Sequence, residues 1–219
     1  MNDVDDNDPG TRAAELGCAT LVDAMGRVHR HRSHILALKS PEPHRPLFGP
    51  AATIAYLPYR DDVPQVDLGF AELFYDAIGQ DPGGQVLVLS SGGYPDASHG
   101  GGTKLSRVEN HQLAGVLADG RLRDFEQLRS FTFATWCRGE ATRWGGDTVM
   151  PYAADVAVEI DGVTVTPGDY VYADASGAVV IPAASLTRVL DEADAVERED
   201  REAAVHIREE RRAAELDHQ

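Results

Sequence analysis

The stretch VLVLSSGGYPDASHGGGTKLSRVENHQLAGVLADGRLRD, residues 86–124, decides the fold of this chain. It begins with an unbroken apolar run at 86–89, which is typical of a strand buried on both faces. A glycine-rich loop follows, then a helical pattern with Thr103 as its expected N-cap, then a second apolar run at 113–118. A strand, a helix and a strand in this order predict a βαβ unit with a parallel pair of strands.

The flanking sequence adds helices and strands to this unit, so we predict a single α/β domain. The dipeptide Asp161-Gly162 between two alternating segments predicts a β-hairpin. Four prolines make residues 39–50 a rigid extended connector. The other predicted helices cover 12–28, 70–78 and 183–216, and the other predicted strands cover 51–56, 155–160, 163–165, 170–172 and 178–181.

Charge divides the chain into three parts. Residues 1–10 are rich in Asp and predict a disordered acidic tail. Residues 11–195 carry the patterned elements of one compact domain. Residues 196–219 continue the last helical pattern with few apolar positions, so we expect a charged helical extension there.

Composition excludes several classes of function. With 42% hydrophobic and 26% charged residues, the 219-residue chain matches ordinary globular proteins, and no apolar run is long enough for a membrane helix. A net charge of -16 disfavours a nucleic-acid partner, because phosphate contacts need clustered Lys and Arg. The acidic first residues do not resemble a secretory signal, so we expect a cytoplasmic protein without a membrane partner.

The two cysteines, Cys18 and Cys137, are isolated in the sequence. Neither has the CxxC or His spacing of a zinc site. A disulfide between them is the alternative, but we expect reduced structural thiols in a cytoplasmic chain.

The glycine run before the predicted helix is the first candidate binding segment. Gly101, Gly102, Thr103 and Lys104 place backbone N–H groups at a helix start, which favours an anion. The alternative is a flexible surface loop. The order of residues fits neither a Walker motif nor the glycine fingerprint of a dinucleotide or methyltransferase cofactor site.

Arg123 and Asp124 form the second candidate, just after the strand at 113–118. The carboxyl ends of parallel strands line the ligand crevice in open α/β sheets. Arginine can bind a carboxylate through two hydrogen bonds, and an aspartate can hold Mg²⁺ or Mn²⁺. The alternative is an ion pair on the surface.

Four further residues are additional candidates. Glu140, Arg143 and Asp147 belong to a polar, glycine-punctuated loop that could line the same cleft, although a solvated loop explains them equally well. His99 precedes the glycine run and is a candidate proton carrier, with a solvent-facing loop position as the alternative.

Three segments of the sequence resemble the RraA-like family. They are the glycine loop and helix at 101–112, LAGVLADGRLRD at 113–124, and PGDYVYADASGAVVIP at 167–182. The family includes class II pyruvate aldolases, namely 4-hydroxy-4-methyl-2-oxoglutarate aldolase and oxaloacetate decarboxylase, and proteins named as regulators of ribonuclease activity. The resemblance implies an α/β domain with a swivelling β/β/α-type core in a homotrimer or hexamer, with active sites between subunits.

The resemblance also implies roles for these residues. Arg123 would bind the carboxylate of a small 2-oxo acid, Asp124 would hold a divalent metal, and the backbone of 101–104 would cradle the substrate. The implied reaction is retro-aldol cleavage or decarboxylation through a pyruvate enolate, with the metal as Lewis acid.

Two positions depart from the family pattern. Aldolases of the family carry an acid where this chain has Gly102, and an apolar residue where it has Lys104. These changes imply weaker metal binding and a more anionic ligand. They leave open a second interpretation, a non-catalytic regulatory or binding protein.

Overall fold

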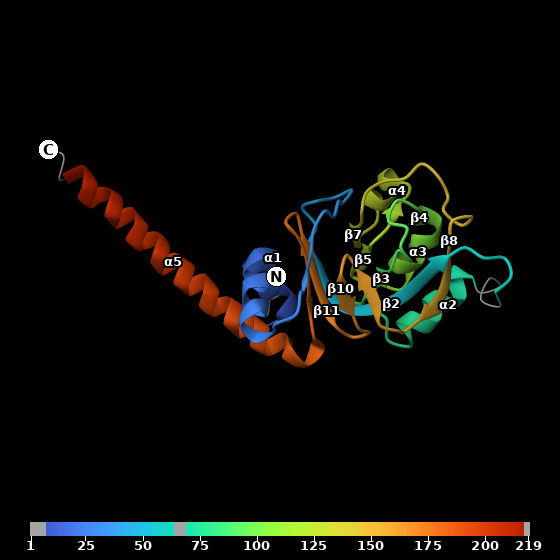
Figure 1. Ribbon diagram of the computed structural model, residues 1–219, viewed down its shortest axis with the longest axis horizontal. Helices are drawn as coiled ribbons and strands as arrows, with labels where there is room; N and C mark the ends of the chain where they lie inside the picture. The colour runs from blue at the N-terminus through green and yellow to red at the C-terminus, as the bar shows by residue number, and fades with distance from the viewer. Residues whose placement is uncertain (1–7, 64–68, 217–219) are drawn as a thin grey trace, which may run out of the picture.

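A long strand, β2 (Leu47–Pro58), joins the two halves of a mixed sheet in the computed structural model, which describes residues 8–63 and 69–216 (Figure 1). Its first part pairs antiparallel with β11, and its second part pairs parallel with β3 and antiparallel with β8 (Val149–Ala154). The spatial order of the remaining strands is β1 (His34–Ile35), β12 (Gly177–Ile181), β11 (Tyr170–Asp174), β2, β3 (Val86–Leu89), β5 (Gly115–Ala118) and β7 (Ala134–Trp136).

The predicted βαβ unit is confirmed. β3 and β5 lie side by side in parallel, with Val86 opposite Gly115 and Leu89 opposite Ala118. Their residues are buried on both faces of the sheet, which explains the continuous apolar runs in the sequence.

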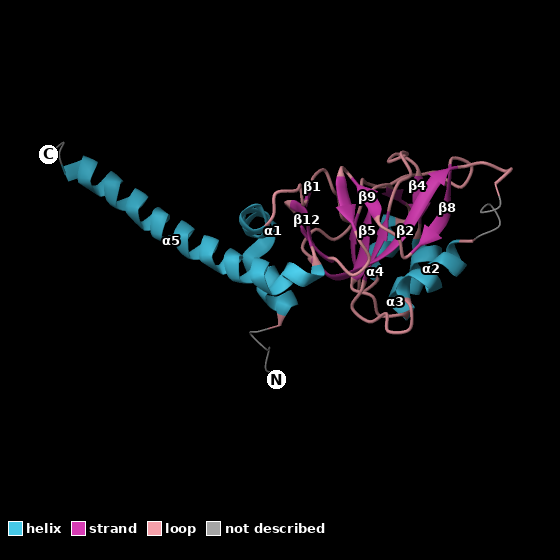
Figure 2. Ribbon diagram, turned by 60° about the horizontal axis from the view of Figure 1, so that its bottom comes forward, coloured by secondary structure: helices cyan, strands magenta, loops and turns pink. Residues whose placement is uncertain are grey.

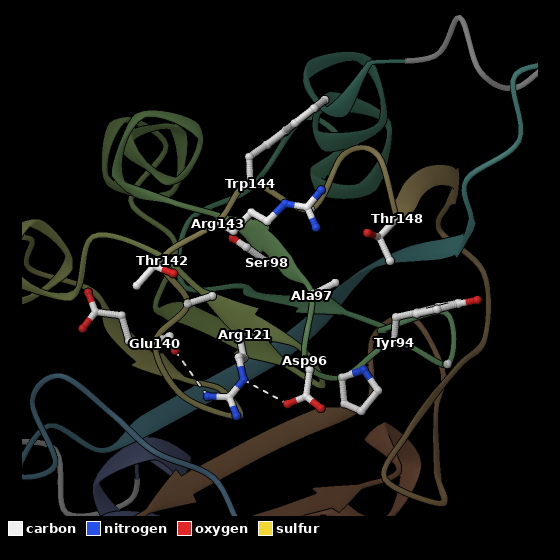
Figure 3. Close-up of a pocket in the computed structure, with 14 residues that line it drawn as sticks. Tyr94, Asp96, Ala97, Ser98, Arg121, Glu140, Thr142, Arg143, Trp144 and Thr148 are labelled. Carbon is white, nitrogen blue, oxygen red and sulfur yellow. Dashed lines mark hydrogen bonds and ion pairs between the residues drawn. The ribbon is translucent and has the colours of Figure 1, made fainter.

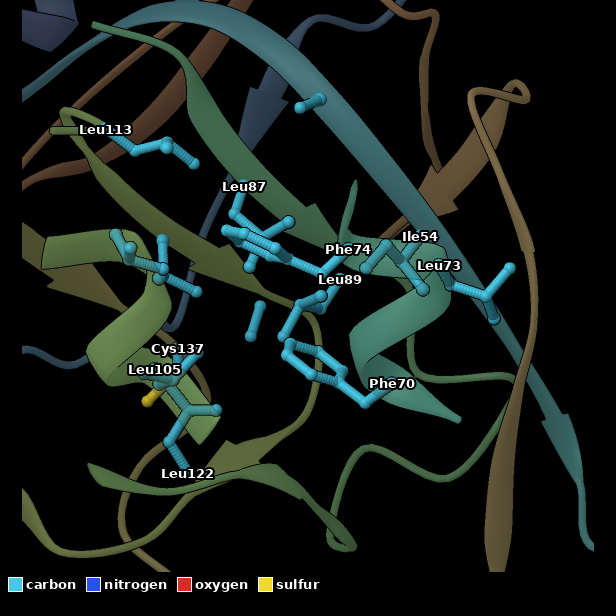
Figure 4. Close-up of a cluster of buried hydrophobic side chains, with 14 of the residues drawn as sticks. Ile54, Phe70, Leu73, Phe74, Leu87, Leu89, Leu105, Leu113, Leu122 and Cys137 are labelled. Carbon is cyan, nitrogen blue, oxygen red and sulfur yellow. The ribbon is translucent and has the colours of Figure 1, made fainter. Parts of the chain in front are cut away.

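Three helices cover one face of the parallel strands: α2 (Phe70–Ile78), α3 (Gly102–Asn110) and α4 (Phe125–Ser130). Figure 4 shows the cluster between them and the sheet, where Phe74 lies by Leu87 and Leu89, and Leu105 lies by Leu122 and Cys137. The hairpin of β9 (Val158–Ile160) and β10 (Val163–Val165) packs on the opposite face (Figure 2). The domain therefore has three layers, namely the β9–β10 hairpin, the main sheet and the helices. This is the arrangement of a β/β/α core.

The remaining helices pack against the antiparallel half of the sheet. α1 (Pro9–Val28) and the start of α5 (Leu186–Leu216) form a cluster with β11 and β12, and a short 3₁₀ turn, η2 (Ala183–Ser185), leads into α5. The rest of α5 extends away from the domain as a single helix (Figure 1). The N-terminal helix and the long charged C-terminal helix were both predicted.

Several predicted boundaries are wrong. Asp8 caps α1, so residues 9 and 10 are helical rather than part of a tail, while residues 1–7 lie outside the described residues. β2 begins inside the predicted proline connector. The hairpin strand β9 begins at Val158 instead of 155, because Asp155 has a left-handed backbone (φ 54°).

Two expectations concern the chain as a whole. No helix among the described residues is both long and apolar enough to cross a membrane. Cys18 and Cys137 are both free and buried, as expected for structural thiols.

Candidate functional site

A two-stranded parallel ribbon brings the two candidate segments together. β4 (Ser98–Gly100) pairs with β6 (Arg121–Leu122), and the Arg123 N–H donates to the carbonyl of Gly100 at 2.9 Å. The glycine loop and the Arg-Asp pair, 20 residues apart in the sequence, therefore meet beyond the carboxyl ends of β3 and β5.

The glycine loop starts α3, but its cap differs from the prediction. Gly101 rather than Thr103 is the N-cap, and it has no side chain with which to cap the helix. The first helical hydrogen bond joins Leu105 N–H to the Gly101 carbonyl at 3.0 Å. The amides of Thr103 and Lys104 therefore have no acceptor within the helix and can receive an anion.

Asp124 and Gln127 lie directly over two glycines of the loop. The Gly102 N–H donates to Asp124 Oδ2 at 3.0 Å. A Cβ on Gly101 would come within 2.5 Å of the same Oδ2, and a Cβ on Gly102 would overlap the Gln127 amide. A larger residue at either position would therefore displace the Asp124 or the Gln127 side chain.

Glu140 holds the start of α4, and the Asp124 carboxylate points away from that helix. Asp124 is the N-cap residue of α4, with a left-handed backbone (φ 64°), yet it makes no side-chain bond to its own helix. The Phe125 N–H donates instead to Glu140 Oε1 at 2.9 Å. Glu140 thus satisfies the helix start, and the Asp124 carboxylate is left to face the glycine loop.

A small pocket of about 50 Å³ opens between the loop and the Arg-Asp pair. Two cations, Arg123 and Lys104, and one carboxylate, Asp124, line it. Its full lining is Ser98, Gly100, Gly101, Thr103, Lys104, Arg123, Asp124 and Trp144.

The two cations of the pocket are available for a ligand. Arg121, Arg138 and Arg143 each pair with a carboxylate. Among the described residues, neither Arg123 nor Lys104 makes such a pair, and the Lys104 ammonium lies over the Phe70 ring, 5.1 Å from its centroid. Burial, with help from Arg123 and Arg107, lowers the pKa of Lys104. The pocket therefore has an excess of positive charge and suits an anion.

The other predicted residues lie next to this pocket rather than in it. Glu140 and Arg143 line a larger cavity of about 620 Å³, which shares only Ser98 and Trp144 with the small pocket. In Figure 3, Arg121 lies between Asp96 and Glu140, whereas Arg143 and Trp144 lie at the other end. The remaining candidate of this loop, Asp147, forms an exposed ion pair with Arg143 and lines neither cavity.

His99 is buried behind the loop, with 1% of its surface exposed. Its Nδ1 lies 2.9 Å from the Ala97 carbonyl and its Nε2 3.1 Å from the Ser91 carbonyl. Burial lowers the pKa of His99 below its usual value. Both ring nitrogens face backbone carbonyls, so the geometry gives the histidine no direct contact with a substrate in the small pocket.

The residues fit a divalent cation held by few protein ligands. Among the described residues, no group of three or more His, Cys, Asp or Glu side chains converges on a metal position. Mg²⁺ commonly uses one or two carboxylates and completes its shell with water and substrate. Asp124 can supply one such carboxylate, since within the described parts of the chain its side chain bonds only to the Gly102 amide.

Sequence reasoning missed Ser98, which lines the pocket, and Gln127, whose side chain lies against Gly102. Ser98 lines all three cavities that meet there, including one of about 190 Å³ behind Lys104. A signal for Gln127 did exist, because Asp124-Phe-Glu-Gln127 has the spacing of a capping box. That signal predicts bonds within α4, not contact with Gly102.

Comparison with known proteins identifies a family. The model described as RraA-like, Aldolase/RraA, matches residues 18–180. A solved structure from Streptomyces coelicolor, RraAS2, is described as an unusual member of the RNase ES inhibitor RraA protein family. It superposes with a TM-score of 0.76 at 26% identity, over 93% of this chain and 98% of that chain.

Two curated relatives show the same likeness in sequence. A Burkholderia multivorans protein named "Putative 4-hydroxy-4-methyl-2-oxoglutarate aldolase" is 32% identical over 144 residues, or 64% of this chain and 77% of that protein. Protein DlpA of Legionella pneumophila is 29% identical over 165 residues, which is 74% of this chain. The match covers 26% of DlpA, so this chain spans about a quarter of that relative's length.

Proposed function

Because this chain belongs to the RraA-like family, we propose that it is a divalent-metal-dependent lyase acting on a small 2-oxo acid. The reaction is retro-aldol cleavage or decarboxylation, with pyruvate as the product. The observation that carries this proposal is the shared pocket of Arg123, Asp124 and the glycine loop, in which two cations have no carboxylate partner among the described residues.

Each residue has a distinct task in this proposal. Arg123 binds the substrate carboxylate through two parallel hydrogen bonds. The free amides of Thr103 and Lys104 and the Lys104 ammonium hold the remaining anionic oxygens. Asp124 holds Mg²⁺ or Mn²⁺, which when bound would polarise the 2-oxo group as a Lewis acid.

The proposal includes an assembly. The pocket is small and shallow, and a homotrimer or hexamer with sites at subunit boundaries would cover it. Its partners are then the 2-oxo acid and further copies of this chain.

Turnover of oxaloacetate tests the proposal. The protein with Mg²⁺ or Mn²⁺ should produce pyruvate, followed through a coupled dehydrogenase, and EDTA should stop production. Arg123→Ala and Asp124→Asn should each lower kcat/KM at least 100-fold, about 3 kcal/mol. Arg201→Ala and Asp200→Asn, on the exposed part of α5, are matched controls and should behave as the unmodified protein.

A non-catalytic regulator is the second candidate. Gly102 in place of an acid favours it, as does the likeness to RraAS2 over 93% of this chain. Absence of turnover with a panel of 2-oxo acids, together with no shift of melting temperature on adding metal, would favour this candidate over the lyase.

A further inference from the structure

The cavity of about 190 Å³ behind Lys104 continues from the small pocket but differs from it in chemistry. The two share Ser98, Lys104 and Trp144, so a ligand can extend from one into the other past the lysine. Among the described residues that line the cavity there is no carboxylate and no arginine, and aromatic and aliphatic side chains make up most of its wall. We call it the aromatic cavity.

Buried side chains form the inner wall of the aromatic cavity. Four of them expose 6% of their surface or less, namely Tyr56, Phe70, Val149 and Met150. The hydroxyl of Tyr56 already donates to the His99 carbonyl at 3.1 Å, so this residue offers its ring rather than a polar group. A wall of this kind suits an apolar part of a ligand.

Two exposed aromatic side chains form the outer wall. Tyr59 is 42% exposed and Trp144 is 57% exposed. The Trp144 ring lies directly against Gly146, where a Cβ would overlap it. A ring bound between these side chains would remove apolar surface of both from water, which favours binding.

The larger cavity of about 620 Å³ is a poorer place for such a group. Four charged residues line it, namely Asp96, Arg121, Glu140 and Arg143. Arg121 bonds to Asp96 at 3.0 Å, and Arg143 pairs with Asp147. An apolar group would remove these charges from water without giving them a new partner. A second carboxylate of a ligand would have to compete with the carboxylates already bound there.

We infer that the aromatic cavity binds an uncharged apolar group of the substrate, about as large as a phenyl ring, while Arg123 and Lys104 bind the substrate carboxylate. This inference rests on the proposed function and narrows the substrate to a 2-oxo acid with one carboxylate and an apolar side group. Lys104 lines both spaces, and its ammonium lies 5.1 Å from the centroid of the Phe70 ring. The carboxylate would neutralise this cation at the entrance to the apolar space.

Calorimetric titration with two ligands tests the inference. Pyruvate and phenylpyruvate carry the same 2-oxo carboxylate and differ by a phenyl ring. With Mg²⁺ present throughout, phenylpyruvate should bind the full chain about 10-fold more tightly than pyruvate, or better, because its ring is buried. Arg123→Ala should weaken the binding of both ligands, since it removes the group that holds their common carboxylate.

Two exposed tyrosines give a matched pair of variants. Tyr59→Ala should weaken phenylpyruvate binding about 5-fold and leave pyruvate binding unchanged, whereas Tyr59→Phe, which keeps the ring, should bind both ligands normally. Tyr94 is 43% exposed and lines the larger cavity but not the aromatic cavity. Tyr94→Ala is therefore the control and should leave both affinities unchanged. Circular dichroism establishes that each variant is folded.

The outcomes separate this inference from the proposed function. Equal affinities for the two ligands, both lost in Arg123→Ala, would overturn the role of the aromatic cavity and leave the carboxylate site intact. No binding of either ligand would overturn the carboxylate site itself. Tighter binding of phenylpyruvate that is weakened by Tyr94→Ala and not by Tyr59→Ala would assign the ring to the larger cavity and contradict the inference. Phenylpyruvate binding at full strength in Arg123→Ala would also contradict it, since the ring alone would then hold the ligand.

Discussion

Lys104 is the least conventional residue of the pocket. Lys104 is half-buried and makes no ion pair within the described chain, and its ammonium lies 5.1 Å from the centroid of the Phe70 ring. Burial is the largest cause of its lowered pKa. A charge held in this way opposes folding unless a ligand neutralises it. This is the pattern expected of a residue kept for binding.

Replacing Lys104 by Met should therefore separate stability from binding. Lys104→Met keeps the apolar contact with Phe70 and removes the charge, so the melting temperature should rise by roughly 2 °C. The affinity for a 2-oxo acid should fall by about 10-fold, since one charged hydrogen bond is lost. Differential scanning fluorimetry and calorimetric titration measure the two quantities. A lower melting temperature with unchanged affinity would show that the lysine serves the fold alone.

The cysteines should be unreactive in the folded protein. Burial raises the pKa of Cys18 to about 12 and that of Cys137 to about 11. Only the thiolate attacks a thiol reagent, and its fraction grows as pH rises toward these values, so little is present at pH 8. Ellman's reagent at pH 8 should label no thiol in buffer and two in guanidinium chloride. Rapid labelling of the native chain would contradict the burial of both side chains.

At the scale of single elements, a side chain from outside α4 holds the start of this helix beside Asp124, the proposed metal ligand. Glu140 Oε1 accepts from the Phe125 N–H at 2.9 Å, and so fixes the backbone directly after Asp124, the N-cap residue of this helix. The position of the Asp124 carboxylate thus depends on a side chain from the loop after β7. Glu140 is a positioning residue in this arrangement.

Removing the cap should affect both stability and metal binding. Glu140→Ala should lower the free energy of unfolding by about 1 kcal/mol and loosen the backbone at Phe125, next to Asp124. Mn²⁺ affinity should then fall, whereas Glu140→Gln, which retains an acceptor, should keep most of both. Urea denaturation and Mn²⁺ titration check this. Equal Mn²⁺ affinity in all three proteins would contradict the positioning role.

The elements that the sequence predicted are those with strong local patterns. β3 and β5 are continuous apolar runs, the hairpin carries Asp161-Gly162, and α2 ends at Gly79. The ribbon of β4 and β6 was missed because its strands have only three and two residues and no apolar period. Thr103 was wrong as a cap because the Gly102 amide already bonds to Asp124, a contact across 22 residues.

In the candidate site, too, sequence analysis found the residues that have a local pattern and missed those that do not. Arg123 and Asp124 were found because they are adjacent in the sequence after a strand, and the structure brings them to the glycine loop as expected. The contact between Gln127 and Gly102 depends on how α3 and α4 pack together, which no local pattern encodes.

At the scale of the whole molecule, the assembly should decide activity. The proposed sites lie between subunits, so light scattering should give a mass three or six times that of the 23.6 kDa chain. Turnover per chain should fall when dilution separates the subunits, because a lone subunit leaves the pocket open. A fully active monomer at high dilution would contradict the shared site.

The central claim is that this pocket generates a pyruvate enolate with the help of a divalent metal. The most direct measurement is exchange of the pyruvate methyl protons in D₂O, followed by proton NMR, because it needs no knowledge of the natural substrate. We predict exchange with Mg²⁺ or Mn²⁺ that stops with EDTA and is lost in Arg123→Ala and Asp124→Asn. No exchange with either metal, or exchange that persists at full rate in Asp124→Asn, would contradict the claim.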